Sequence, residues 1–161
     1  SKLTITAGSQ SFEINKTQSG TAAITFAAPL TATTAFTLTA TDARKATSTK
    51  QTTIYFLNGK YYGVSNVTDT SKLDAAFVKG LTRNLVSGRA GSWNVTANAG
   101  QYIYFAIPAS FGTPAFYVGG FEGGFNKVKT FDFTNASGYT ASYNIYRSTN
   151  AGLGATTVEV K

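Results

Sequence analysis

The sequence contains no cysteine, no methionine and no histidine among its 161 residues. Without cysteine the chain has neither disulfides nor thiolate metal sites. Without histidine it also lacks the side chain that most often serves as a general base or metal ligand near neutral pH. Charged residues make up only 13% of the chain. These absences remove the commonest catalytic and transition-metal sites, so we expect no metal, no cofactor and no enzymatic activity.

Long hydrophobic runs are also missing, and no basic-then-apolar segment opens the chain. The sequence therefore predicts neither a membrane-spanning helix nor a signal peptide. The net charge of +7 can attract nucleic acid or an acidic surface, but the basic residues are scattered and match no RRM-like, KH-like or basic-helix pattern. We expect no specific nucleic-acid binding, and we favour weak attraction to an acidic cell surface or polysaccharide.

Hydrophobic residues, at 42%, and aromatic residues, at 14%, are plentiful enough to build a proper core. They occur in short runs with a period of two, which is typical of β-strands separated by turns. In the first part of the chain the runs are Thr21–Phe26, Ala35–Ala40 and Gln51–Leu57. Ala28-Pro29 and Asp42–Lys45 separate them and are predicted to be turns.

Six further runs in the second half predict strands: Ser92–Ala97, Gln101–Pro108, Ala115–Gly120, Lys127–Phe133, Tyr139–Ser148 and Ala155–Lys161. The predicted fold is mostly β, an antiparallel, jelly-roll-like sandwich forming a single domain over residues 1–161. Within it, a Thr-rich subdomain over residues 1–50 is expected to pack on an aromatic and Gly-rich module over residues 51–161. A terminal strand usually ends inside a sheet, so Lys161 is expected to lie near the natural C-terminus.

One segment, Thr70–Leu81, has helical character. Thr70 or Ser71 is the predicted N-cap, with Asp74 as the acid of a capping box. We expect a helix of about three turns that covers an end of the β-structure through Leu73, Ala76 and Phe77, which share one apolar face.

Turn signals are strongest at glycines. Asn58-Gly59 between two apolar runs predicts the two-residue loop of a type I′ hairpin, with strands over Thr52–Leu57 and Lys60–Val64. The doublet VGGFEGGF predicts a sharp corner at which Phe121 and Phe125 pack inward, in preference to a ligand loop. The glycines assigned to structural turns are Gly59, Gly119, Gly120, Gly123, Gly124, Gly138, Gly152 and Gly154.

Only seven carboxylates are available for catalysis, and they are isolated in the sequence. Glycoside hydrolysis needs two of them facing across a sugar, which the sequence does not indicate. Asp69 and Asp74 flank the predicted helix start and are better explained as caps than as calcium ligands. Ser71-Lys72 is adjacent in sequence and lacks the geometry of a nucleophile pair.

Flat aromatic rings with polar neighbours are the remaining binding chemistry, because sugar rings stack on tyrosine and tryptophan. The alternative is that these rings are core or half-buried strand residues whose polar ends reach the surface. We take Trp93, Tyr61, Tyr62 and Tyr139 as candidate surface contacts, and the wider set adds Tyr102, Tyr104, Tyr117, Tyr143 and Tyr146.

Four phrases, QYIYFAIP, FYVGGFEGGF, TNASGYT and NIYRSTNAGLG, lie in a region covering about Gln51–Val160. Together they resemble a β-rich module of virion structural proteins of tailed bacteriophages, found mostly near the C-terminus of tail-fibre or fibre-like chains. The resemblance implies a particle component that is made in the host cytoplasm, exposed on the virion and trimeric. It carries over no catalytic or ligand-binding residue.

The sequence thus favours a non-enzymatic phage structural module, fibre or tail-associated, that acts in particle assembly and host-surface attachment. Its expected partners are other virion proteins, further copies of itself and a bacterial surface glycan. Two alternatives stay open. One is a capsid-decorating or head-fibre protein that binds only virion proteins, and the other is a secreted bacterial carbohydrate-binding module.

Overall fold

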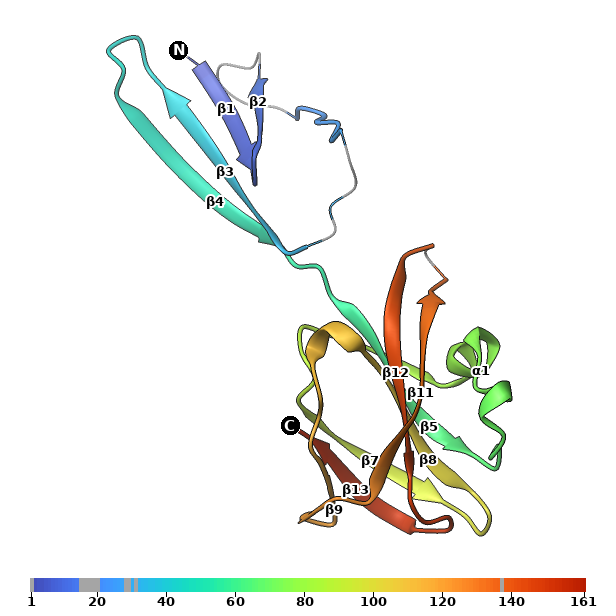
Figure 1. The fold of residues 1–161 in the computed structure, drawn as a ribbon. Coiled ribbons are helices and arrows are strands. Elements are labelled where there is room, and N and C mark those ends of the chain that lie inside the picture. The colour runs from blue at the N-terminus through green and yellow to red at the C-terminus, as the bar shows by residue number, and fades with distance from the viewer. Residues whose placement is uncertain (1, 15–20, 28–29, 31, 137) are drawn as a thin grey trace. The chain divides into compact units, whose positions relative to one another are not determined.

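A computed structural model describes residues 2–14, 21–27, 30, 32–136 and 138–161. The chain divides into two compact units, Ser1–Leu57 and Asn58–Lys161. Strands account for 57% of the residues and helices for 8%, which confirms the mostly-β class. The predicted limit of the Thr-rich part, residue 50, falls inside the last strand of the first unit (Figure 1).

The first unit is one antiparallel sheet of four strands in the order β2-β1-β3-β4. Its strands are β1 (Lys2–Ala7), β2 (Gln10–Ile14), β3 (Thr34–Thr41) and β4 (Thr47–Ile54). The strand predicted over Thr21–Phe26 is wrong, because this segment has no regular backbone structure. Its alternation reflects packing instead: the Phe26 ring lies edge-on between Phe12 and Phe36, with centroid distances of 5.3 and 5.7 Å.

The turn predicted at Asp42–Lys45 is confirmed. The Asp42 carboxylate accepts hydrogen bonds from the backbone N–H groups of Arg44 and Ala46, and Lys45 has a positive φ of 65°. The turn predicted at Ala28-Pro29 lies outside the described residues.

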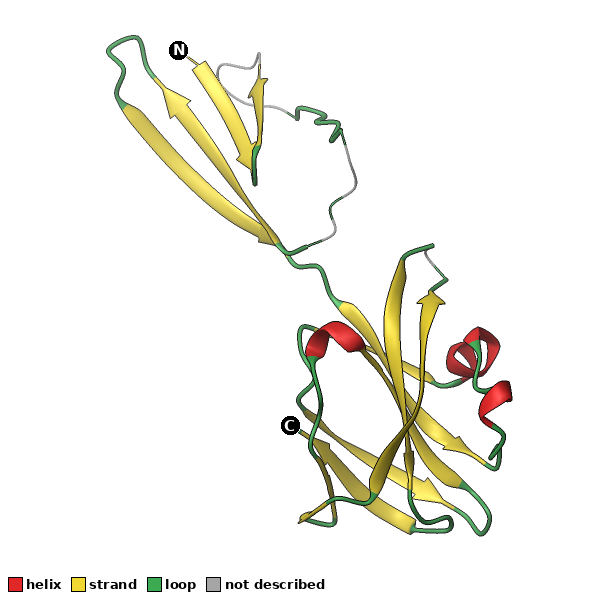
Figure 2. Ribbon diagram, in the orientation of Figure 1, coloured by secondary structure: helices red, strands yellow, loops and turns green. Residues whose placement is uncertain are grey.

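The second unit contains two antiparallel sheets (Figure 2). The four-stranded sheet has the order β10-β9-β13-β7, and the five-stranded sheet has the order β11-β12-β8-β5-β6. The strands are β5 (Asn58–Ser65), β6 (Thr82–Val86), β7 (Gly91–Ala97), β8 (Tyr102–Pro108), β9 (Phe116–Val118), β10 (Phe121–Glu122), β11 (Phe125–Thr134), β12 (Thr140–Ser148) and β13 (Gly154–Val160). Each of the six strands predicted for the second half corresponds to one of these strands.

The two sheets pack as a sandwich around an aromatic core, which confirms the predicted architecture. Phe105 of β8 meets two rings of the opposite, four-stranded sheet, with centroids 5.4 Å from Trp93 and 5.6 Å from Phe116. Phe125 closes this core by stacking on Phe116 at 4.4 Å. Offset and edge-to-face ring pairs of this kind add to the free energy of area burial.

The other face of the five-stranded sheet is covered by the helical segment, which Figure 1 shows on the side away from β7 and β13. The predicted single helix is two short pieces, a 3₁₀ turn (Thr70–Lys72) and α1 (Ala75–Gly80). Asp69 caps the first piece and Asp74 the second, so the predicted caps Thr70 and Ser71 are wrong.

Two of the three residues predicted for the apolar face, Leu73 and Phe77, contact the sheet, and Val78 takes the place of Ala76. Leu73, between the two pieces, and Val78 are fully buried, and Phe77 meets the Tyr104 ring at 5.0 Å. Ala76, which was expected on the apolar face, is exposed. Because the sheet between these layers is covered on both faces, six of the seven residues of β8 are buried.

The hairpin predicted at Asn58-Gly59 is wrong. Both residues lie in β5, opposite Val86 and Leu85 of β6, and Gly59 does not have a positive φ. The glycine serves a close approach, since a Cβ at this position would lie 3.0 Å from the ring of Tyr61 in the same strand. The packing of the Tyr61 ring outweighs the preference of Asn58-Gly59 for a turn.

The glycine doublet forms a corner, as the sequence predicts. Gly119, Gly120, Gly123 and Gly124 all have positive φ, which favours glycine over any other residue. Gly138, Gly152 and Gly154 have the same property. Of the two doublet phenylalanines, Phe125 packs inward, but Phe121 is 82% exposed because β10 is a two-residue edge strand.

We predict that Gly91→Ala lowers the free energy of unfolding by about 2 kcal/mol, because the new Cβ overpacks the core side of β7. It would lie 2.3 Å from the Trp93 ring. Gly88→Ala, in the preceding loop, is the control, since a Cβ there meets nothing within 4 Å. Urea denaturation compares the two variants, and equal midpoints would contradict the close approach.

Candidate functional site

The two carboxylates that flank the predicted helix start, Asp69 and Asp74, are both used within the helical segment. Asp69 accepts hydrogen bonds from Ser71, and Asp74 from the N–H of Phe77, so both serve as helix caps. Their pairing as a calcium site is therefore not supported. Within the described part of the chain, no group of three or more acidic, histidine or cysteine side chains lies close enough to hold a metal ion.

The four aromatic residues proposed as surface contacts do not form a common surface. Trp93 is 7% exposed and Tyr61 4%, so both belong to the core. Tyr62 is half-buried and packs against Trp93 and Phe105. Tyr139 is 36% exposed and follows the Asn135–Gly138 turn. The alternative reading of these rings, as structural residues, is correct for the first three.

Lys60 is the most unusual ionisable residue, because its side chain is fully buried. Its Nζ lies 4.2 Å from the centroid of the Trp93 ring and donates to the backbone carbonyls of Arg89 and, at 3.5 Å, Ala90. Burial lowers the pKa of Lys60 from 10.5 to about 8. The contacts fasten the loop between β6 and β7, which assigns Lys60 a structural role.

A polar surface lies on the face of the four-stranded sheet that points away from the core; we call it the outer face. Strand register places Glu122, Tyr117, Glu159 and Ser92 in one row across β10, β9, β13 and β7. The next rows contain Thr157 opposite Asn94 and Ala155 opposite Thr96. Residues directly opposite in an antiparallel pair share a face, so the rows form one continuous surface.

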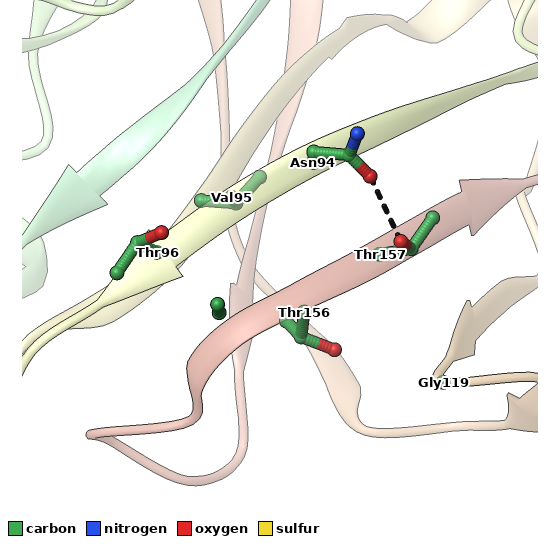
Figure 3. Close-up of a pocket in the computed structure, with 7 residues that line it drawn as sticks. Asn94, Val95, Thr96, Gly119, Thr156 and Thr157 are labelled. Atoms are coloured by element: carbon green, nitrogen blue, oxygen red, sulfur yellow. Dashed lines mark hydrogen bonds between the residues drawn. The ribbon is translucent and has the colours of Figure 1, made fainter.

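The outer face is hollowed next to this row. The hollow has a volume of about 460 Å³ and is open to solvent. Figure 3 shows Asn94 and Thr157 facing each other on adjacent strands, where the Thr157 hydroxyl donates to Asn94 Oδ1 at 2.8 Å. The full lining consists of Asn94, Val95, Thr96, Gly119, Ala155, Thr156 and Thr157. None of these side chains is ionisable.

The row beside the hollow is held in place by its own contacts. The Tyr117 hydroxyl donates to Glu122 Oε2 at 3.2 Å, and Lys161 Nζ lies 4.2 Å from the Tyr117 ring centroid. Lys161 is also 3.6 Å from Glu159 Oε2. In this row Tyr117 stands between the two glutamates, so they do not face each other across an open groove as a hydrolytic pair would.

The lining can bind a neutral, hydroxyl-rich ligand. Asn94 donates through its amide nitrogen, and threonine hydroxyls both donate and accept, which matches the hydroxyls of a sugar. Gly119 and Ala155 are the two smallest residues of the lining. Among the sequence candidates only Tyr117, from the wider tyrosine set, lies on this face. The alternation in SWNVTA and ATTVEV was the signal in the sequence that could have found Asn94 and Thr157. The strand register that brings the two residues together could not be read from the sequence.

None of the described helices combines the length and the apolar character that crossing a membrane requires. No protein-family model matches the chain, and comparisons with curated proteins and with solved structures find no match.

We predict that the protein becomes more stable as the pH rises from about 8 to about 10. In this window unfolding takes up a proton, because the lowered pKa leaves Lys60 neutral in the folded chain while the unfolded chain is still protonated. The gain is at most about 3 kcal/mol. Above pH 10 the trend reverses, because burial raises the pKa of Tyr104, Tyr143 and Tyr146 and their ionisation then favours unfolding.

Denaturant midpoints measured across this pH range test the assignment. Lys60→Met should flatten the rise, whereas Lys127→Met, at an exposed position, should keep it. An unchanged rise in Lys60→Met would show that another group causes it.

Proposed function

We propose that the protein is a non-enzymatic structural and attachment module of a phage virion, fibre or tail-associated, that contacts a bacterial surface glycan through its outer face. The observation that carries the attachment role is the hollow between Asn94, Thr96, Thr157 and Gly119. It combines uncharged hydrogen-bonding groups with the small residues Gly119 and Ala155. The sequence resemblance supplies the virion setting.

The sandwich is suited to this role, because its shape rests on packing alone. Among the residues described in the second unit, eighteen hydrophobic residues are buried and eight of them are aromatic, and the chain contains no cysteine that a disulfide would need. A core of this kind forms equally in the reducing cytoplasm and outside the cell. The outer-face strands β7 and β13 are anchored by Trp93, Val158 and Val160 beneath them. Their polar side chains are therefore held in fixed positions before a ligand arrives.

Contact with another virion protein is the second candidate function. Phe121 supports it, since this side chain is 82% exposed at the glycine corner and offers an apolar anchor to a partner. Imaging of the particle separates the two candidates. A position at a distal tip favours attachment, and a position on the capsid shell favours decoration.

We predict that the double variant Asn94→Ala with Thr157→Ala binds bacterial glycans about tenfold more weakly than the unaltered chain, because two hydrogen-bonding side chains are lost. The measurement uses the labelled full chain on an array of purified lipopolysaccharides and capsular polysaccharides.

The five-stranded sheet offers a matched control, because Thr130 Oγ1 and Asn144 Oδ1 form the same cross-strand hydrogen bond at 2.7 Å. Asn144→Ala with Thr130→Ala should bind as the unaltered chain does. Absence of binding to every polysaccharide, or equal loss in both double variants, would rule out the outer face as the attachment surface.

A further inference from the structure

A small pocket lies in the loop that follows β5, beside the helical segment of the second unit. Its volume is about 250 Å³, and its lining consists of Asn66, Val67, Thr68, Asp69 and Lys72. We call it the loop pocket. Val67 is half-buried and packs against the cluster beneath the helical segment, and the other four residues are exposed. The helical segment covers the side of the second unit away from β7 and β13 (Figure 1), so the loop pocket is distinct from the hollow of the outer face.

Three side chains of the five-stranded sheet hold the backbone of this loop. The carbonyl groups of Val67, Thr68 and Thr70 accept hydrogen bonds from them. The donors, in the same order, are the Tyr104 hydroxyl, Arg147 Nη1 at 2.9 Å and Lys129 Nζ at 3.1 Å. Because strands β8, β11 and β12 already fix the loop, little conformational freedom remains to be lost when a ligand binds.

The same contacts gather positive charge at the loop pocket. Lys72 lines it, and Arg147 and Lys129 are held beside it by their bonds to the loop. The one carboxylate of the lining, Asp69, accepts hydrogen bonds from Ser71, which lower its pKa, and the charges of Lys72 and Lys129 lower it further. Among the described residues, none of the three cations forms an ion pair with a carboxylate. The surroundings of the loop pocket therefore carry an excess of positive charge.

The cations keep hydrogen-bonding capacity for a ligand. An arginine has five N–H donors and a lysine three, and the bond to the loop occupies one donor of Arg147 and one of Lys129. The Arg147 guanidinium also lies 5.0 Å from the centroid of the Tyr102 ring, a cation–π contact that fixes its position. Lys72 is exposed on the 3₁₀ turn and can extend its ammonium group over the loop pocket.

The lining determines which chemical class of ligand fits. A carboxylate or phosphate forms charge-assisted hydrogen bonds with Lys72, and hydroxyl groups pair with the Asn66 amide and the Thr68 hydroxyl. The Asp69 carboxylate repels a plain polyanion such as nucleic acid, but it accepts hydrogen bonds from a hydroxyl. A ligand that carries both an anionic group and hydroxyls satisfies every member of the lining. The volume lies below the range of about 300–1,000 Å³ found for drug-sized ligands, so it suits one sugar residue.

We propose that the loop pocket binds an acidic sugar residue of a bacterial polysaccharide, with the carboxylate or phosphate of the sugar on Lys72 and its hydroxyls on Asn66, Thr68 and Asp69. Lys129 and Arg147 hold the loop and add to the positive potential that attracts the anion. The hollow of the outer face, by contrast, has no ionisable side chain in its lining and suits a neutral glycan. The two sites share no residue, so either can exist without the other.

Binding of the labelled full chain to immobilised polymers tests the proposal. The polymers are polygalacturonate, a capsular polysaccharide with phosphodiester-linked sugars, and duplex DNA. The chain should bind at least one of the two acidic polysaccharides, and Lys72→Gln should raise the dissociation constant about tenfold, because a charge-assisted contact is lost. Lys79→Gln is the matched control: it removes the same charge from an exposed position in the last turn of α1, outside the loop pocket, and should leave binding unchanged.

Three results would overturn the proposal. The first is the absence of binding to both acidic polysaccharides. The second is an equal loss in both variants, which would show that the net charge of +7 attracts the polymer without a defined site. The third is tighter binding to duplex DNA that depends on Lys72, which would assign the loop pocket to nucleic acid.

A second measurement locates the ligand on the unaltered chain. Amide NMR spectra are recorded during titration with trigalacturonate or glucose 6-phosphate, according to which polymer binds. The amide signals of residues 66–72 should shift, and those of Asn94 and Thr157 should not. Shifts confined to the outer face would overturn the loop pocket and support the proposed function. The double variant Asn94→Ala with Thr157→Ala should keep its binding to the acidic polysaccharide, so the two proposals can fail separately.

Discussion

The packing of aromatic rings on both faces of β8 is the constraint on which the second unit depends. Phe105 points into the space between the sheets and Tyr104 points toward the helical segment, so one strand holds three layers together. The burial of Tyr61 in the same system explains why Gly59 is a strand residue. The burial of Trp93 likewise explains why Gly91 precedes it by two positions.

The same packing determines which side chains remain available for the surface. Trp93 and most of the tyrosines are used in the core, where Tyr143 also donates a hydrogen bond to the Gly59 carbonyl at 2.7 Å. The hollow of the outer face is therefore lined by hydroxyl, amide and small apolar side chains, and the row beside it contains Tyr117, Glu122 and Glu159. Of the four aromatic residues expected as surface contacts, Trp93 and Tyr61 are therefore buried.

The two units bury their apolar surface in different ways. The second closes two sheets and a helical segment around two clusters of buried residues. The first has a single sheet, and its alternation of apolar and hydroxylated residues produces two faces of opposite character. Within the described residues of this unit, Phe26 packs against Phe12 and Phe36 on the apolar side of the sheet.

The sequence by itself determined the mostly-β class, the strands of the second half and the glycine corners, because period-two alternation and positive φ are local properties of the chain. It did not predict that Asn58-Gly59 lies inside a strand or that Thr21–Phe26 is irregular, since ring packing decided both: that of Tyr61 in the first case, and that of Phe26 between Phe12 and Phe36 in the second. Asn94 and Thr157 are 63 positions apart, and only strand register brings them together. Register is set by which side chains bury together, so only the tertiary structure decided where the candidate site lies.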